Sequence, residues 1–203
     1  MTVDLAPQKR ALRAELRERR RLLTSTQRSA ATEGLTARLT GLTAALGARS
    51  VSCYLSAVDE PNTRPYVNAM RASGVRVLFP ITRADGLLDW TTATDEEEEV
   101  VGVAGVPEPV GEPLGPIAIN DVDLILVPAA AVDAAGVRLG WGRGYYDKTL
   151  GSMERCPPVY AVVFDSELVD QVPRERHDQA VDGAVTPTRT VEFPTRSARR
   201  RRI

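Results

Sequence analysis

The sequence predicts an α/β protein in which helices cover a mostly parallel β-sheet. Several apolar runs have the length of strands and alternate with stretches of helical periodicity. The run at residues 123–128 is apolar almost throughout, which is typical of a strand buried on both faces of a parallel sheet. Alternating strands and helices indicate a layered α/β fold. We expect one domain over residues 1–194 and a basic, disordered tail at 195–203.

Two helices are expected before the first strand. The first begins near Pro7, since proline suits a first helical turn. Its apolar stripe consists of Leu12, Leu16 and Leu23. The second helix is expected to be capped by Ser25 or Thr26 and to end at Gly47. Four leucines at helical spacing form its core face: Leu35, Leu39, Leu42 and Leu46.

The middle of the chain is expected to alternate between strands and helices. A buried strand is followed by a polar turn at 56–62 and a helix that starts near Thr63 or Arg64. The strands are expected at 51–55, 75–80 and 87–91. Residues 95–116 are rich in acid, glycine and proline, so we expect mostly loop there.

The last third carries the central strand and the edge of the sheet. The apolar run at 123–128 is expected to be central and leads into a glycine-rich segment. A helix is expected to begin at Tyr145, and a further strand at 159–164. Residues 172–178 read as a polar connection, and 184–190 as one last edge strand.

Composition argues against two kinds of partner. The chain has 203 residues, 43% hydrophobic and 26% charged, with a net charge of −1, which is ordinary for a globular protein. This balance gives no overall attraction to nucleic acid or anionic membranes, and no apolar run is long enough to span a bilayer. We expect neither partner. The arginines at 17, 19–21 and 199–202 are expected to be solvated.

Cysteine usage and the start of the chain predict a cytoplasmic protein. Cys53 and Cys156 are the only cysteines, too few for a disulfide scaffold, and both are expected to be reduced. Cys53 lies in an apolar strand and is expected in the core. Residues 1–10 lack the apolar core of a signal peptide.

The most informative stretch is residues 136–147, which combines glycine, arginine and a terminal acid. Gly140, Gly142 and Gly144 let a ligand approach the main chain, and successive N–H groups there form an anion-binding nest. The helix that follows adds a further anion-binding end. Arginines and an acid within the stretch suit a polyphosphate and its metal: Arg138, Arg143 and Asp147. A sharp surface turn remains the plain alternative.

This stretch also resembles the signature of the 5-formyltetrahydrofolate cyclo-ligase family, or 5,10-methenyltetrahydrofolate synthetases. The resembling residues are Arg138-Leu139-Gly140-x-Gly142-x-Gly144-Tyr145-Tyr146-Asp147. Other pieces match in the same order: Lys9-x-x-Leu12-Arg13, Tyr54-Leu55-Ser56, Asp59-Glu60-Pro61-Asn62-Thr63, Gly105-Val106-Pro107-Glu108-Pro109, His177-Asp178 and Thr186-Pro187. The resemblance runs from Lys9 to about Pro187. It implies a three-layer α/β/α fold similar to that of sugar-phosphate isomerases and CoA transferases.

The resemblance implies a reaction that needs positioning more than a protein nucleophile. The family converts 5-formyltetrahydrofolate and ATP to 5,10-methenyltetrahydrofolate, ADP and phosphate. Phosphorylation of the formyl oxygen makes a leaving group, and N10 of the same folate attacks the activated carbon. Such a transfer depends on placement and charge stabilisation. Accordingly, the chain shows no Gly-x-Ser-x-Gly elbow and no Cys–His pair.

The resemblance also implies which residues act. ATP is expected at Lys9, Arg13, Arg138, Leu139, Gly140, Trp141, Gly142, Arg143, Gly144, Tyr145, Tyr146 and Asp147. The folate is expected at Leu55, Glu60, Trp141 and Tyr145, with Glu60 accepting hydrogen bonds from the pterin. Arg138, Arg143 and Tyr146 are expected to assist the chemical step. Mg²⁺ is expected at Asp147 and Asp178.

Three expectations remain open on residue type alone. The spacing of Lys9 and Arg13 fits two solvated charges as well as a phosphate pair. Tyr145 and Tyr146 suit either folate contacts or packing of the loop. His177, the only histidine, is expected at the surface or behind the site.

Two other functions fit parts of the pattern. A sugar-phosphate isomerase or transferase of similar fold would use the same phosphate cradle without ATP, but the chain shows no acid/base pair near the loop. A non-catalytic nucleotide- or RNA-binding protein would use the arginine clusters, but in this chain no aromatic residues are interleaved with them. We expect a monomeric enzyme.

Overall fold

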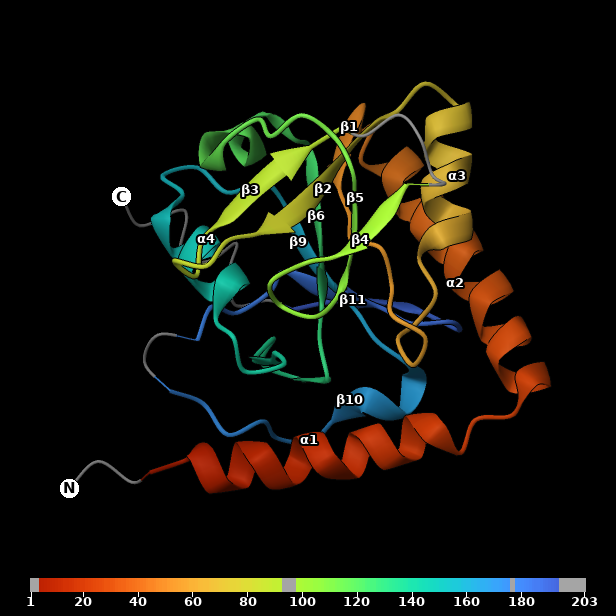
Figure 1. Ribbon diagram of the computed structural model, residues 1–203. Coiled ribbons are helices and arrows are strands. Elements are labelled where there is room, and N and C mark those ends of the chain that lie inside the picture. Colours follow the sequence, from red (N-terminus) through yellow and green to blue (C-terminus); the bar gives the residue numbers. More distant parts are fainter. Residues whose placement is uncertain (1–3, 93–97, 176–177, 194–203) are drawn as a thin grey trace.

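The computed structural model describes residues 4–92, 98–175 and 178–193, and its centre is a mixed seven-stranded sheet. The strand order is β12-β11-β9-β6-β1-β2-β3 (Figure 1). The five inner strands are parallel, whereas β12 and β3 pair antiparallel at the two edges. The bounds are β1 Ser50–Ser52, β2 Arg76–Thr82, β3 Leu88–Thr91, β6 Leu124–Pro128, β9 Val159–Val162, β11 Gly183–Val185 and β12 Thr190–Glu192. The mostly parallel α/β sheet is therefore confirmed.

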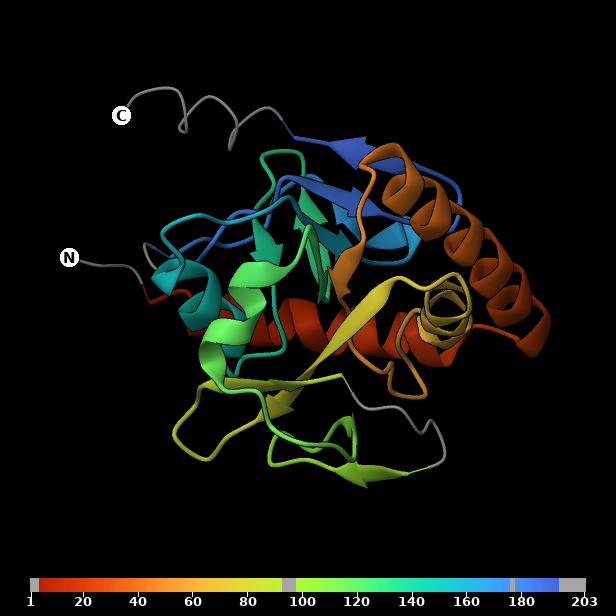
Figure 2. The ribbon, with the colours of Figure 1, turned by 90° about the horizontal axis from the view of Figure 1, so that it is seen from above.

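Helices cover both faces of this sheet. The helices α2 (Ser25–Ala45) and α3 (Arg64–Ala72) lie on one face, and α4 (Tyr145–Ser152) and η1 (Pro116–Asp121) lie on the other (Figure 2). The central strand β6 supplies both cores, because its side chains alternate in direction. Leu124 and Leu126 join the core under α2 and α3, whereas Ile125 and Val127 join the opposite one.

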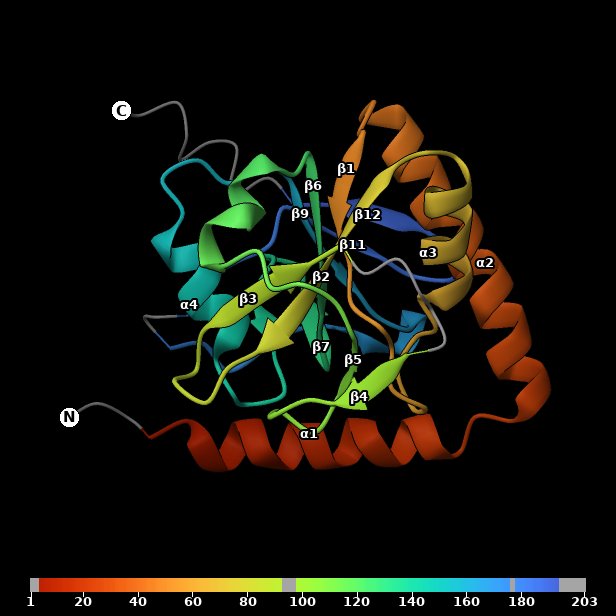
Figure 3. The same ribbon diagram turned by 45° about the horizontal axis from the view of Figure 1, so that its top comes forward.

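The first helix, α1 (Ala6–Arg21), lies across the carboxyl ends of the parallel strands rather than on a face of the sheet (Figure 3). Its Leu16 is fully buried in a third, smaller core with Ala130 and Leu139. Ligands of open α/β sheets bind beyond the carboxyl ends of the strands. The helix therefore encloses the edge where a site is expected.

Several sequence predictions need correction at their boundaries. The second helix is capped by Thr24, not by Ser25 or Thr26: Gln27 N donates to the Thr24 hydroxyl at 3.2 Å, and Thr24 N donates to the Gln27 side chain. The strand expected at 51–55 ends at Ser52. Cys53 N still donates to the Leu78 carbonyl of β2 at 3.0 Å. The Tyr54 carbonyl instead accepts from the hydroxyl of Thr63, the N-cap of α3, at 2.7 Å.

Two regions contain more strand than predicted. The described part of 95–116 lies mostly outside regular elements, as predicted, but it also contains the short hairpin β4 (Glu99–Val101) and β5 (Pro107–Pro109). Its glycines make the turn, with Gly105 at φ +74°. The single edge strand expected at 184–190 is a second hairpin, β11 and β12, closed by a bond from Thr186 N to the Arg189 carbonyl. The tail at 195–203 lies outside the described residues.

The remaining elements are short and lie near the carboxyl edge. They are β7 (Ala131–Asp133), β8 (Arg138–Leu139), η2 (Asp165–Glu167) and β10 (Leu168–Val169). No helix in the described ranges is long and apolar enough to cross a membrane.

Candidate active site

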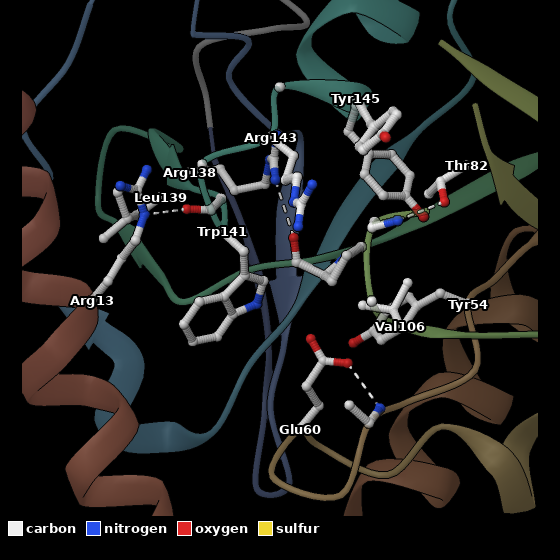
Figure 4. Close-up of a pocket in the computed structure, with 18 of the residues that line it drawn as sticks. Arg13, Tyr54, Glu60, Thr82, Val106, Arg138, Leu139, Trp141, Arg143 and Tyr145 are labelled. Atoms are coloured by element: carbon white, nitrogen blue, oxygen red, sulfur yellow. Dashed lines mark hydrogen bonds between the residues drawn. The ribbon is translucent and has the colours of Figure 1, made fainter. Parts of the chain in front are cut away.

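A cavity of about 1000 Å³ lies at the carboxyl edge of the sheet. Its walls come from α1, the loop after β1, the β4–β5 hairpin and the glycine segment (Figure 4). Every residue that the sequence predicts for the site lines this one cavity: Lys9, Arg13, Leu55, Glu60, Arg138, Leu139, Gly140, Trp141, Gly142, Arg143, Gly144, Tyr145, Tyr146, Asp147 and Asp178. Segments that are far apart in the sequence therefore converge.

The glycine segment forms an open turn between β8 and α4. Gly142 and Gly144 have φ values of +96° and +72°, which side-chain-bearing residues rarely adopt. Gly144 is the N-cap of α4 and offers no capping side chain, so the first N–H groups of the helix have no side-chain acceptor at the cap. Arg13 Nε donates to the Gly140 carbonyl at 2.7 Å and fixes the turn to α1.

The predicted cations and the predicted metal carboxylates are paired with one another. Lys9 Nζ lies 2.7 Å from Asp178 Oδ2 and 2.6 Å from Glu175 Oε2. Arg138 Nη2 lies 3.1 Å from Asp147 Oδ1. Lys9 is buried, and although burial opposes its charge, the two carboxylates raise its pKa. This end of the cavity thus contains balanced charge, with Arg143 exposed at the rim.

The opposite end of the cavity surrounds Glu60. Its Oε2 accepts a hydrogen bond from Ala57 N at 3.0 Å, and burial of the carboxyl raises its pKa. Arg20 and the indole N–H of Trp141 lie toward the carboxylate and favour its charged form. This carboxyl therefore has hydrogen-bonding capacity left for a ligand (Figure 4).

Four buried polar atoms in the cavity wall have no hydrogen bond of ordinary geometry to any residue that the structure describes. They are Tyr54 OH, Tyr146 OH, Trp141 Nε1 and Arg138 Nε. Buried polar groups almost always find partners. Their common location indicates that the cavity binds a polar ligand.

The two tyrosines of the glycine segment differ. The Tyr145 hydroxyl donates to the Arg83 carbonyl at 3.0 Å and ties α4 to the end of β2. Tyr146 lies under Arg138, 5.9 Å from guanidinium carbon to ring centroid, and burial raises the pKa of its phenol. Both rings also pack on the core beneath α4, so each has a packing role as well.

Sequence reasoning missed two acidic or basic groups in the wall. Glu108 is buried and accepts hydrogen bonds from Thr82 N and its hydroxyl. Glu108 belongs to the Gly-Val-Pro-Glu-Pro segment that resembles the family, and this resemblance could have indicated a place in the site. Arg20 was expected to be solvated but is 2% exposed, because it pairs with Glu167. Helical periodicity could have indicated that Arg20 is buried, because it lies four residues after the buried Leu16 on the same helix.

The described residues contain no cluster of three or more His, Cys, Asp or Glu side chains arranged for a metal. Asp147 and Asp178 both line the cavity, and each lies beside a cation. His177 lies outside the described residues. Cys53 is in the core, as predicted, and burial raises the pKa of its thiol to about 12, which is unsuited to a nucleophile.

Known proteins resemble the chain over most of its length. A family model described as the 5-formyltetrahydrofolate cyclo-ligase family matches residues 6–187. A 5-formyltetrahydrofolate cyclo-ligase of Mycolicibacterium smegmatis is 36% identical over 188 residues, covering 90% of this chain and 95% of the relative. The Escherichia coli K12 cyclo-ligase is 28% identical and covers 88% and 100%.

The fold agrees with this match. The solved 5,10-methenyltetrahydrofolate synthetase of Aquifex aeolicus superimposes with a TM-score of 0.75 at 26% identity, covering 92% of this chain and 93% of that one. The glycine segment, the matched length and the superposition agree, and the chain belongs to the 5-formyltetrahydrofolate cyclo-ligase family.

Proposed function

We propose that this protein catalyses the ATP-dependent cyclisation of 5-formyltetrahydrofolate to 5,10-methenyltetrahydrofolate, with release of ADP and phosphate. One observation carries the proposal: a single cavity has two chemically different ends. One end combines a glycine turn with Lys9 and Arg138, and the other combines Glu60 with unpartnered polar groups. Such an arrangement suits a polyphosphate facing a polar heterocycle.

The residues of the glycine end fit ATP. A Cβ built on Gly142 would be in van der Waals contact with the Arg13 guanidinium, 3.4 Å from Cζ, so a side chain there would occupy space beside that cation. The buried Arg138 Nε has no hydrogen bond to a described residue, and a phosphate oxygen would satisfy it. Lys9, Arg13, Arg138 and Arg143 would neutralise the phosphates, each in part, while the turn supplies backbone N–H groups.

The same end fits Mg²⁺. Magnesium is usually held by one or two carboxylates together with phosphate oxygens and water. Asp147 and Asp178 are the two carboxylates we assign to it. The ion would supply charge neutralisation at the phosphates. Since each carboxylate now pairs with a cation, we infer that Lys9 and Arg138 turn toward phosphate when the carboxylates bind metal.

The Glu60 end would hold the folate. We assign Leu55 and Trp141 to the walls around the pterin and Glu60 to its N–H donors. The hydroxyl of Tyr145 is already bonded, so its ring rather than its oxygen would contact the folate. Tyr146 OH is free of protein partners among the described residues and is available to orient the substrate.

The chemical step then requires no protein nucleophile. The formyl oxygen attacks the γ-phosphorus, and the bond to the leaving ADP oxygen breaks. N10 attacks the formyl carbon and loses its proton, and the carbon–oxygen bond breaks to release phosphate. Arg138 and Arg143 would stabilise charge on the transferred group, and Tyr146 would position the acceptor. Exclusion of water by the enclosing α1 and β4–β5 walls would protect the activated formyl group from hydrolysis.

The test is turnover of purified protein with 5-formyltetrahydrofolate and Mg-ATP, followed through the near-ultraviolet absorbance of the methenyl product. We expect that absorbance to grow only when protein, ATP and magnesium are all present. ATP binding without product formation would refute the folate substrate and direct the search to sugar phosphates.

We also infer that the enzyme acts as a monomer in the cytoplasm and binds no nucleic acid. Cys53 and Cys156 are buried and form no disulfide in the part of the chain that the structure describes, which suits a reducing compartment. The net charge of −1 gives no general attraction to nucleic acid. Light scattering of the purified chain tests the oligomeric state, and a salt-sensitive shift with RNA would refute the last inference.

A further inference from the structure

Arg20 is a buried cation at the cavity wall that the proposed reaction leaves without a role. Its Nε donates to Glu167 Oε1 at 2.6 Å, and its Nη2 donates to Glu167 Oε2 at 3.0 Å and to the Ala129 carbonyl at 2.8 Å. Both side chains are at most 3% exposed. Glu167 is fixed in turn, because its Oε2 accepts from Phe164 N at 2.8 Å.

These bonds lock one end of α1 to the carboxyl ends of two central strands. Ala129 directly follows β6, and Phe164 lies just after β9. The planar guanidinium meets the carboxylate with two parallel bonds, which fixes its orientation as well as its position. Arg20 is therefore a rigid group rather than one of the solvated arginines of α1.

The rigid guanidinium lies against Trp141 of the glycine segment. Its central carbon is 4.9 Å from the Trp141 ring centroid, within the range of a cation–π contact, and Arg17 lies 5.3 Å from the same ring. Trp141 Nε1 is buried and lies toward Glu60. The contact thus sets both the plane of a cavity wall and the direction of an N–H donor.

We propose that Arg20, held by Glu167, is a positioning residue that orients Trp141 and so shapes the folate end of the cavity, not the ATP end. This inference rests on the proposed function. Arg20 itself has its Nε and Nη2 bonded within the protein, and the charge of Glu167 opposes its effect on Glu60, so it acts through the indole. The prediction is a selective effect on folate binding.

The test is a double-mutant cycle on folate and ATP affinities, measured by calorimetry. R20M/E167Q removes both charges together, which avoids a lone buried carboxylate, and the glutamine oxygen still accepts from Phe164 N. We expect the folate Kd to rise about tenfold and the ATP Kd to change by less than about twofold. In a W141L background the same pair should change the folate Kd by less than about twofold, because its target is gone.

A matched control is R21M, which removes an exposed arginine of the same helix. Among the described residues Arg21 pairs with Glu18 alone, across one turn, and R21M should leave both affinities unchanged. Equal losses of folate and ATP binding in R20M/E167Q, or a full tenfold loss in the W141L background, would show a general structural role and overturn the inference.

Acrylamide quenching of tryptophan fluorescence separates this inference from the proposed function. Trp90, the only other tryptophan, is fully buried. Quenching should therefore increase in R20M/E167Q without any ligand. A wild-type protein that binds no folate would refute the function, whereas unchanged quenching would refute the positioning role.

Discussion

Individual charges in this site are held by partners from distant parts of the chain. Lys9 pairs with carboxylates about 170 positions later in the sequence, and Arg138 pairs with Asp147 across the glycine turn. Pairing keeps buried charges tolerable without a ligand, since an isolated buried ion is strongly unfavourable. The cations that we propose for phosphate and the carboxylates that we propose for Mg²⁺ would therefore have to exchange these partners for ligands.

Replacing Asp178 and Glu175 one at a time distinguishes a carboxylate that binds Mg²⁺ from one that only balances the charge of Lys9. Asp178→Asn and Glu175→Gln each weaken a bond to Lys9 of similar length. We expect Asp178→Asn to raise the Mg²⁺ concentration for half-maximal turnover at least about tenfold and Glu175→Gln to change it by less than about twofold. Equal effects in a magnesium titration would mean that Asp178 serves only Lys9.

The charged carboxylate of Glu60 is expected to lower the stability of the folded protein, although we assign it to folate binding. Burial raises the pKa of its carboxyl, so the folded state holds the proton more tightly than the unfolded chain. The stability gained from the neutral form is present below pH 4.5 and is lost as pH rises through the raised value. Glu60→Gln should therefore melt about 2 to 4 °C higher than wild type near pH 8 and equally near pH 4.

The same substitution should weaken folate binding about ten- to a hundredfold, because a hydrogen bond to a charged acceptor is lost. Thermal melts at both pH values and a folate titration check the pair of effects. Higher stability without weaker binding would remove Glu60 from the folate site.

Gly142 tests the phosphate cradle. Gly142→Ala forces a side chain into φ +96° beside Arg13, and we expect ATP affinity to fall at least about tenfold. The matched control is Gly47→Ala, which carries similar strain at φ +61° far from the cavity with no atom within 4 Å. It should lower the melting temperature without changing ATP affinity. If ATP binds Gly142→Ala normally, the turn does not hold the phosphates.

At the scale of elements, the caps and turns decide where helices and strands stop. The second helix begins after Thr24 because Thr24 and Gln27 satisfy each other's backbone N–H groups. Ser25 and Thr26, the caps expected from residue type, lie one and two positions inside that pair. The hairpins arise likewise from glycine or proline turns between short strands.

The cap makes a simple prediction for stability. Thr24→Ala should lower the free energy of unfolding by about 1 kcal/mol, because the Gln27 N–H loses its acceptor. Thr26→Ala, an exposed change two residues further along the chain, should be neutral or slightly stabilising, since alanine favours helices. Urea denaturation measures the free energy of unfolding of both variants. An equal decrease in the two would contradict the capping box at Thr24 and Gln27.

At the scale of the whole molecule, α2 packs tightly against the turn that connects β11 to β12. A Cβ on Gly34 would lie 2.4 Å from the Pro187 carbonyl oxygen, whereas Gly41 on the same helix has no atom within 4 Å of such a Cβ. Two glycines of one helix therefore meet opposite environments, and only the tertiary contact distinguishes them.

Alanine at these two sites should change stability in opposite directions. Gly34→Ala should lower the free energy of unfolding by about 1 to 3 kcal/mol through overpacking against backbone. Gly41→Ala should raise it by up to about 1 kcal/mol through helix propensity. Thermal and urea unfolding check both signs. A stabilising Gly34→Ala would mean that α2 does not approach Pro187 this closely.

Local patterns in the sequence determined the fold class, the central strand and the glycine segment. An uninterrupted apolar run marks a strand covered on both faces, and Gly142 and Gly144 mark backbone conformations that need no tertiary information. The family resemblance then selected the residues that line the cavity.

The tertiary structure alone decided which charges pair. Helical spacing places Arg20 on the buried side of α1 with Leu16, but it does not reveal the partner of Arg20. Arg20 meets Glu167, 147 positions later, whereas Arg19 and Arg21 pair with acids of their own helix. Pairing and burial depend on side chains that come together only when the strands assemble, because Coulomb attraction and desolvation act through space and not along the chain. The charge state of the site is for that reason a property of the folded molecule.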